Sequence, residues 1–160
     1  MKKIIILSGG FDPIHSGHAY MFWAAKARFT AYPETYLAVC LNSDEWLCKK
    51  KGINFMPFYE RQKIVSAMKH VDYVFPFEDD EAGTAINGIK GVVKYFGSFP
   101  GVSFAFGNGG DRGAANTPEQ TFCEENDIEL VFGLGDKVQS SSDLLKRYGN
   151  WYAFNRVSWA

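Results

Sequence analysis

The sequence predicts an α/β protein built on a doubly wound parallel sheet of the Rossmann-like type. The apolar run Ile4-Ile5-Ile6-Leu7 is stopped by Ser8-Gly9-Gly10, which is typical of a strand buried on both faces of a parallel sheet. From residue 17 to residue 29, apolar side chains recur at helical spacing. Strand-like and helix-like patterns then alternate along the rest of the chain, as they do in βαβ units with right-handed crossovers.

The remaining elements follow from the same two periodicities. Short apolar runs predict further strands at residues 36–41, 71–75, 102–106 and 128–132. Helices are expected over residues 59–69, over residues 140–148, and along the stripe Ala82, Ile86, Ile89, Val93 and Phe96. Residues 107–119 form a polar loop longer than a simple connection requires, and the tail 151–160 is aromatic but shows no pattern.

Composition predicts one cytoplasmic domain over residues 1–160. The length fits a single domain with a buried core, and the apolar start is too short for a signal peptide or a membrane span. A formal net charge of -1 supplies no field for a nucleic-acid backbone, so neither a nucleic-acid polymer nor a membrane is expected as a partner. Cys40, Cys48 and Cys123 are too widely spaced for a zinc site and odd in number, which predicts free thiols, with Cys40 in the core.

The segment of residues 9–18 follows the first strand and opens the first helix. Its backbone amides are therefore expected to point at a bound phosphate. His15 and His18 are three residues apart at the helix start, where both could donate hydrogen bonds to charge that develops during phosphoryl transfer. The alternative is that one histidine caps the helix and the other lies on the surface.

The sequence H-x-G-H, preceded by Gly-x-Phe-Asp-Pro at the first strand-to-helix turn, resembles the signature of the cytidylyltransferase-like nucleotidyltransferases. Further segments along most of the chain look like successive parts of that family: Leu41-Asn42-Ser43-Asp44, Lys49-Lys50-Lys51, Glu60-Arg61, Val71-Asp72-Tyr73-Val74 and the helix-opening Ser140-Ser141-Ser142. Within the family, these segments are similar to glycerol-3-phosphate cytidylyltransferases and to adenylyltransferase domains that act on heptose 1-phosphate.

The resemblance implies the HUP-type nucleotidyltransferase fold and a reaction. A small phosphorylated substrate, such as a sugar or polyol phosphate, would attack the α-phosphorus of CTP or ATP bound with Mg²⁺, and pyrophosphate would leave without a covalent enzyme intermediate. Catalysis would consist of positioning and charge stabilisation. A homodimer is expected as well.

The resemblance also implies roles for individual residues. The catalytic set is His15, His18, Lys49 and Lys51, because the family places at least one lysine of the run over the phosphates. The nucleotide-binding set is Gly9, Gly10, Phe11, Asp12, Gly17, Gly109, Asp111, Arg112, Ser140, Ser141 and Ser142. Asn42 and Arg61 are expected to bind the substrate, and no protein side chain is expected to ligate a metal.

Several of these assignments have plainer alternatives. A lysine run is usually a solvated face, and Arg61 could form a surface salt bridge or hold structure. The loop around Asp111 could be a flexible turn. Trp23, Trp46, Phe55, Phe58 and Tyr59 are interpreted as core or dimer-contact aromatics, because large apolar rings chiefly fill cores and interfaces.

Two other functions stay open at this point. The chain departs from the family pattern after Asp111 and at Lys137, which stands near the position of a family arginine. These departures would suit a nucleotide-binding regulatory module that no longer turns over. An ATP-dependent ligase of the pantothenate-synthetase kind shares H-x-G-H, but it adenylates a carboxylate and is normally longer.

Overall fold

The computed structural model contains one five-stranded sheet in the order β3-β2-β1-β4-β5, with every neighbouring pair parallel. The structure describes residues 1–109, 113, 117–135 and 139–158, from 151 onward as backbone only. The strands are β1 (Lys2–Gly9), β2 (Glu34–Leu41), β3 (Tyr73–Pro76), β4 (Val102–Gly107) and β5 (Glu129–Val131). The predicted doubly wound parallel sheet is confirmed.

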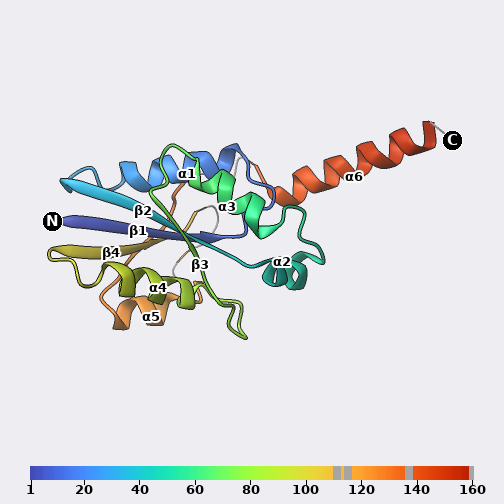
Figure 1. Cartoon of the computed structure of the whole chain (residues 1–160). Coiled ribbons are helices and arrows are strands. Elements are labelled where there is room, and N and C mark those ends of the chain that lie inside the picture. Colours follow the sequence, from blue (N-terminus) through green and yellow to red (C-terminus); the bar gives the residue numbers. More distant parts are fainter. Residues whose placement is uncertain (110–112, 114–116, 136–138, 159–160) are drawn as a thin grey trace.

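Helices cover both faces of the sheet (Figure 1). On one face lie α1 (Ser16–Ala27) and α3 (Phe58–Ser66), and on the other lie α4 (Ile86–Phe96) and α5 (Gln120–Glu125). The short helix α2 (Asp44–Lys51) lies beyond the carboxyl end of β2, and α6 (Ser141–Ser158) projects away from the body. The result is a three-layer arrangement with its carboxyl edge open on the side of α2 and α6.

The central strand β1 explains why the opening run is uniformly apolar. Ile5 and Leu7 pack into the core with α1 and α3, whereas Ile4 and Ile6 pack into the core with α4 and α5. All four side chains are at most 1% exposed. Between Lys3 and Ser8, the two buried faces of the strand leave only apolar positions.

The structure departs from the predicted elements in four places. Helices α2 and α5 were not predicted as helices. Helix α4 begins at Ile86, so Ala82, the first residue of the predicted stripe, lies outside the helix. Helix α6 continues to Ser158, well into the segment interpreted as an unpatterned tail.

The fold brings the carboxyl ends of β1, β2 and β4 to one edge. The sheet order reverses direction between β1 and β4, which is the place where doubly wound sheets bind ligands. Among the helices of the described residues, none has the length and apolar character needed to cross a membrane.

Candidate functional site

A cavity of about 330 Å³ opens at this edge of the sheet. Its wall comes from the ends of β1 and β4, from α1 and α2, and from the segments that precede α4 and α6. Of the residues predicted from the sequence, it brings together Gly9, Gly10, Phe11, Gly17, His18, Asn42, Lys51, Gly109 and Ser141. These residues come from five separate stretches of the chain, so only the fold places them around one space.

The two histidines lie at the start of α1 and hold its first turn together. His15 is the N-cap, and its Nδ1 accepts a hydrogen bond from the Gly17 amide at 3.1 Å. His18 Nδ1 in turn accepts from the His15 amide at 3.2 Å. The two rings stack with their centroids 3.8 Å apart. His18 lines the cavity, and the His15 ring stacks on the His18 ring.

These bonds fix the tautomer of both rings and correct one expectation. Because each Nδ1 accepts a backbone N–H, each neutral imidazole carries its proton on Nε2. The amides of His15 and Gly17 were expected to point at a phosphate, but the imidazoles already occupy them. These two amides are therefore not available to a ligand, whereas the Nε2–H of each ring is left unused by the two bonds. His15 caps the helix, as one alternative held, but His18 is not a surface residue.

The surroundings favour the neutral form of both histidines. Burial, together with the positive charge of Lys51, lowers the pKa of His15. Burial, followed by the neighbouring His15 and Lys51, lowers the pKa of His18 to about 3. At neutral pH both rings are hydrogen-bond donors without a net charge.

The glycines before the histidines are set by close packing. A Cβ on Gly10 would lie 2.6 Å from Leu47 Cδ2, so no larger residue fits between the turn and α2. Phe11 follows in the left-handed region with φ 51°, and its ring meets the edge of His18 with centroids 4.8 Å apart. A non-glycine residue held there costs about 1–3 kcal/mol, which the buried Phe11 ring offsets by packing against Phe22.

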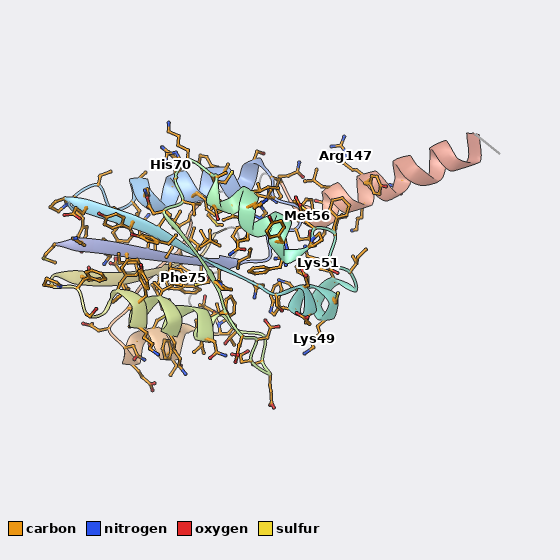
Figure 2. All side chains as sticks on the ribbon, viewed as in Figure 1. Lys49, Lys51, Met56, His70, Phe75 and Arg147 are labelled. Carbon is orange, nitrogen blue, oxygen red and sulfur yellow. The ribbon has the colours of Figure 1, made fainter. Side chains whose placement is uncertain are left out.

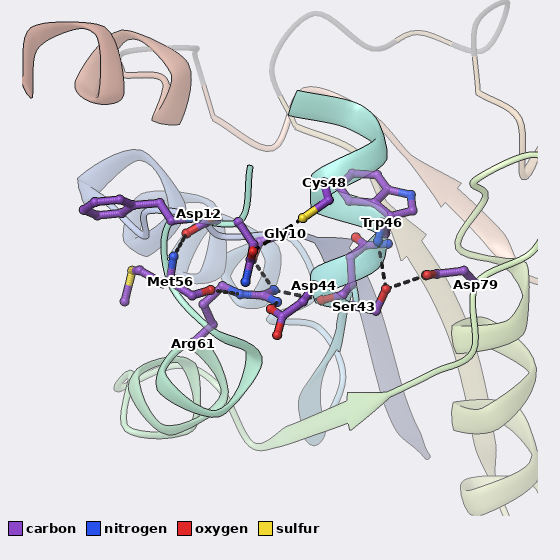
Figure 3. Close-up of polar contacts among 12 residues, drawn as sticks. Gly10, Asp12, Ser43, Asp44, Trp46, Cys48, Met56, Arg61 and Asp79 are labelled. Atoms are coloured by element: carbon purple, nitrogen blue, oxygen red, sulfur yellow. Dashed lines mark hydrogen bonds and ion pairs between the residues drawn. The ribbon is translucent and has the colours of Figure 1, made fainter. Parts of the chain in front are cut away.

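Asp12 anchors the turn instead of facing the cavity. Its carboxylate is fully buried and accepts hydrogen bonds from the amides of Phe55 and Met56 at 2.6 and 2.5 Å (Figure 3). The segment between α2 and α3 is thereby tied to the turn that holds the histidines. The Asp12 side chain, predicted to belong to the nucleotide-binding set, therefore holds the loop in place and is not among the residues that line the cavity.

Arg61 is the largest fully buried side chain in the described part of the protein. It donates to the carbonyls of Met56, Gly10 and Asn42 at 2.8, 2.9 and 2.8 Å, and to Asp44 Oδ1 at 2.7 Å (Figure 3). Burial of Asp44 acts to raise its pKa, but the hydrogen bonds, chiefly from Arg61, outweigh it and leave the pKa lowered. The interpretation as a surface salt bridge is wrong. The predicted substrate contact does not fit either, because four of the five guanidinium N–H groups already bind protein atoms.

The three consecutive lysines point in different directions. Lys51 Nζ donates to the Asp12 carbonyl at 2.9 Å and lines the cavity, and burial lowers its pKa. Lys50 also lines the cavity, and its Nζ lies 4.4 Å from the centroid of the Trp46 ring. Lys49 is exposed on the opposite side of α2 (Figure 2), because two residues turn a helix by about 200°. The catalytic role predicted for Lys49 does not fit its position.

The serine-rich start of α6 lies against the histidine turn. Ser141 Oγ donates to the Pro13 carbonyl at 2.8 Å, and Ser140 Oγ accepts from the Asp143 amide at 3.0 Å. Ser141 lines the cavity, whereas Ser140 caps the helix and Ser142 is exposed. Two helix N-termini, of α1 and α6, therefore meet at one cavity, as the sequence predicts.

The described start of the loop after β4, residues 107–109, packs closely against its neighbours. A Cβ on Gly107 would lie 2.5 Å from Leu134 Cδ1, and one on Gly109 would lie 2.7 Å from Met21 Sδ. Between them, Asn108 is 5% exposed and lines the cavity. Asp111 and Arg112, predicted to contact the nucleotide, and Lys137 lie outside the described residues.

Sequence reasoning missed three residues of the cavity wall. Trp46 was interpreted as a packing residue, but it lines the cavity, and its Nε1 donates to the Gly83 carbonyl at 3.1 Å. Asn108 and Glu119 were not singled out as site residues. The signal for Trp46 was its place one helical turn before Lys50 and behind the N-cap Ser43, which becomes visible only once α2 is recognised as a helix.

The polar side chains do not gather into a metal cage. Among the described residues there is no group of three His, Cys, Asp or Glu side chains placed to hold a metal ion. The three cysteines are free, and Cys40 is buried as predicted.

The chain also resembles known proteins. The model of the cytidylyltransferase-like family matches residues 6–102. The bifunctional protein HldE of Sulfurimonas denitrificans is 34% identical over 93 residues, which are 56% of this chain but only 18% of that protein. The HldE protein of Helicobacter pylori is 35% identical over 92 residues, 56% of this chain and 19% of its own. The chain therefore spans about a fifth of the length of these relatives.

Solved structures share the fold at low sequence identity. A lipopolysaccharide core biosynthesis protein from Thermoplasma volcanium superposes with a TM-score of 0.57 at 16% identity, covering 81% of this chain and 93% of that one. A protein from Vibrio parahaemolyticus assigned as a nicotinate-nucleotide adenylyltransferase gives 0.54 at 17% identity, covering 90% and 78%. With the family model covering more than half of the chain, this protein belongs to the cytidylyltransferase-like family.

Proposed function

We propose that the whole chain is a nucleotidyltransferase domain. It transfers a nucleoside monophosphate from CTP or ATP to a small phosphorylated substrate, a sugar or polyol phosphate, and releases pyrophosphate. The observation that supports this most is the meeting of His18, Lys51 and Ser141 around one cavity between two helix N-termini. Such an arrangement favours a polyphosphate, because helix N-termini and a lysine both attract anions.

The reaction needs no covalent enzyme intermediate. An oxygen of the acceptor phosphate attacks the α-phosphorus of the NTP, a new P–O bond forms, and the bond from the α-phosphorus to the β-phosphate bridging oxygen breaks. The electron pair of that bond leaves with pyrophosphate. The protein's task is to align the two phosphates and to stabilise the charge on the non-bridging oxygens.

The histidines suit this task as neutral donors. Their Nδ1 atoms are held by backbone amides, so the rings are fixed before the ligand arrives. Their Nε2–H groups can then donate to phosphate oxygens without reorganisation during the reaction, which is where preorganised donors contribute most. Lys51 adds a positive charge, and Asp12 keeps its carbonyl in place for the Lys51 ammonium.

Mg²⁺ enters this proposal as part of the NTP substrate. The described residues offer no carboxylate cluster, and the Asp12 carboxylate is already bound to two amides. This fits Mg²⁺, which keeps several waters and is commonly held by substrate phosphates rather than by a protein cage. We also expect a homodimer in the cytoplasm; exposed aromatic residues such as Trp23 and Tyr59 are available for its interface.

The direct test is pyrophosphate release. The purified protein is incubated with Mg²⁺, each of the four NTPs, and a panel of sugar, polyol and choline phosphates. We expect release with one NTP and one class of acceptor. His18→Ala should lower kcat by about 10²–10³-fold, as loss of an oxyanion donor does. His70→Ala is the matched control, because His70 lies far from Lys51 in Figure 2.

The outcome also separates the alternative functions. Tight NTP binding by calorimetry, with no pyrophosphate released for any acceptor, would favour a regulatory module. Absence of NTP binding would reject the proposal altogether. Turnover that depends on a carboxylate acceptor would point to a ligase.

A further inference from the structure

Helix α2 is held by different parts of the protein on two of its sides. Asp44 and Lys51 stand seven residues apart, which is about two helical turns, so they share one side. On that side Asp44 binds Arg61 at 2.7 Å. Lys51 binds the Asp12 carbonyl at 2.9 Å. This side is therefore joined to α3 and to the turn before α1.

The neighbouring side of α2 carries Ser43, Trp46 and Lys50, which stand three and four residues apart. Two hydrogen bonds join it to the loop of residues 77–85, between β3 and α4. The Ser43 hydroxyl donates to Asp79 Oδ2 at 2.5 Å (Figure 3). Trp46 Nε1 donates to the Gly83 carbonyl at 3.1 Å. Lys50, farther along the same side, lines the cavity.

The Ser43 hydroxyl connects this loop to the start of the helix. Its oxygen accepts from the Trp46 amide at 3.0 Å and thereby caps α2. A hydroxyl has one proton to donate and two lone pairs. Since the proton is directed to Asp79, the lone pairs remain for the cap, and the position of Asp79 determines where the helix begins.

The loop itself is held in shape by its own hydrogen bonds. The Asp80 carboxylate accepts from the Thr84 amide at 2.7 Å and from the Thr84 hydroxyl. The Asp80 carbonyl accepts from the Gly83 amide at 3.2 Å, and the Glu78 carbonyl accepts from Asn87 Nδ2 on α4 at 3.0 Å. The loop is therefore tied to α4 and provides a fixed support for α2.

Two supports fix a short helix more completely than one. A helix of eight residues is about 12 Å long, and a helix held on one side can still tilt about that support. The bond to Asp79 lies at the first end of α2, whereas Lys51 is its last residue. A tilt at the start therefore displaces the ammonium groups that line the cavity near the other end.

The second oxygen of Asp79 gives an independent observation. Oδ1 is buried and has no hydrogen-bond partner within the described ranges of the chain. A buried acceptor without a donor destabilises a fold, so stability alone does not account for a carboxylate at this position. The carboxylate fits a requirement for an acceptor directed at Ser43.

We propose that Asp79 is a positioning residue for nucleotidyl transfer: through Ser43 it sets the tilt of α2 and thereby holds Lys50 and Lys51 at the cavity. This inference rests on the function proposed above and adds to it a residue that does not itself line the cavity. The effect of Asp79 on the rate is therefore transmitted by α2.

Substitution of Asp79 tests the inference, with Mg²⁺ and the NTP and acceptor that the pyrophosphate assay identifies. Asp79→Ala removes the acceptor of the Ser43 hydroxyl, whereas Asp79→Asn keeps an acceptor oxygen and the same shape. We expect kcat/KM to fall about 10-fold or more in Asp79→Ala and less than about 3-fold in Asp79→Asn, because a small displacement of a positioned group is costly. Unchanged kcat/KM in Asp79→Ala, or equal losses in both variants, would overturn the inference.

Glu81→Ala is the matched control. It removes an exposed carboxylate from the same loop and should change kcat/KM less than about 2-fold. A loss as large as that of Asp79→Ala would assign the effect to the charge of the loop and overturn the inference.

A double-mutant cycle distinguishes positioning from a general loss of structure. When Lys50→Met and Lys51→Met are combined, adding Asp79→Ala should lower kcat/KM less than about 2-fold further, because no ammonium is left to position. Losses that multiply, as independent effects do, contradict the inference. If Asp79→Ala does not fold, Ser43→Ala takes its place in the cycle, since it removes the other half of the same bond.

Hydrogen exchange follows α2 without any turnover. The amides of α2 should exchange at least about 10-fold faster in Asp79→Ala than in wild type, and at the wild-type rate in Glu81→Ala. Faster exchange with unchanged kcat/KM would restrict Asp79 to stability and overturn the inference. If the wild-type protein neither binds nor turns over any NTP, the proposed function fails and this inference fails with it. If wild type turns over and Asp79→Ala changes neither exchange nor rate, only this inference fails.

Discussion

Arg61 and the pair His15 and His18 both bind backbone atoms of the turn between β1 and α1, but they use their polar groups in opposite ways. Arg61 is fully buried, and its donors bind three carbonyls and Asp44. The histidines accept backbone amides at their Nδ1 atoms, and no further hydrogen bond of their rings joins them to the described residues, so the Nε2–H of His18 can face a ligand in the cavity. Both were predicted from the sequence as site residues, and only the structure separates them.

The difference teaches how to assign a role to a polar residue in this site. A group whose hydrogen bonds are all made within the protein stabilises the fold. When it is removed, its former partners stay buried with neither a protein nor a water hydrogen bond, and this lowers stability. A group that is fixed at one end and available at the other is preorganised for a ligand. Lys51 connects the two, because it binds the Asp12 carbonyl and also lines the cavity.

The largest effect is expected from breaking the Arg61 cluster. Arg61→Met removes four hydrogen bonds and leaves the carbonyls of Gly10, Met56 and Asn42 without their donor. We expect the free energy of unfolding to fall by about 3–5 kcal/mol, as when one partner of a buried ion pair is removed. Urea unfolding measures this change in the free energy of unfolding. Arg28→Met, at an exposed position, is the control. A stable Arg61→Met protein with weakened acceptor binding would restore the substrate-binding assignment.

A smaller effect is expected for the lysines of α2, and it should differ between Lys51 and Lys49. Lys51→Met should lower kcat/KM for the nucleotidyl transfer by about 10- to 100-fold, because a hydrogen bond to a charged group contributes about 1.5–3 kcal/mol. Lys49→Met on the opposite side of the helix should change it less than about 2-fold, as an exposed lysine does. Steady-state kinetics of the two variants, with their unfolding curves, measure the contrast. Equal losses would mean that the cavity attracts its ligand through net charge alone.

Much of the fold could be predicted because β1 is buried on both faces, which leaves a continuous apolar run in the sequence. The helix α2 was missed although its signals are present: Ser43 caps it, acidic residues begin it, three lysines end it, and Gly52 follows with φ 82°. The lysine run was interpreted as a chemical motif, although it also forms the basic last turn of this helix.

The site could be predicted only in part. The signature located the histidine turn and the serine-rich start of α6, and the structure places both at one cavity. The sequence could not show that the rings of His18 and His15 accept from the amides of His15 and Gly17, because that depends on side-chain rotation.

The smallest of the three effects tests the charge state of the histidine pair. In the folded protein, burial and the neighbouring His15 and Lys51 lower the pKa of His18 to about 3, whereas an unfolded histidine titrates near about 6.5. Between these values the unfolded chain binds more protons, so stability is fully present above pH 6.5 and is lost as the pH falls toward 3.

Stability therefore falls as the pH falls, whereas a histidine paired with a carboxylate would make stability rise as the pH falls. Between pH 7 and pH 5, His18 should contribute a loss of roughly 2 kcal/mol in the free energy of unfolding. His18→Gln should abolish that part of the loss, because glutamine does not titrate. Urea unfolding of both proteins at the two pH values measures the difference, in which the carboxylates common to both cancel. An identical pH dependence would mean that folding does not lower the pKa of His18, and the neutral, prepositioned Nε2–H would then not be held against protonation below pH 6.5.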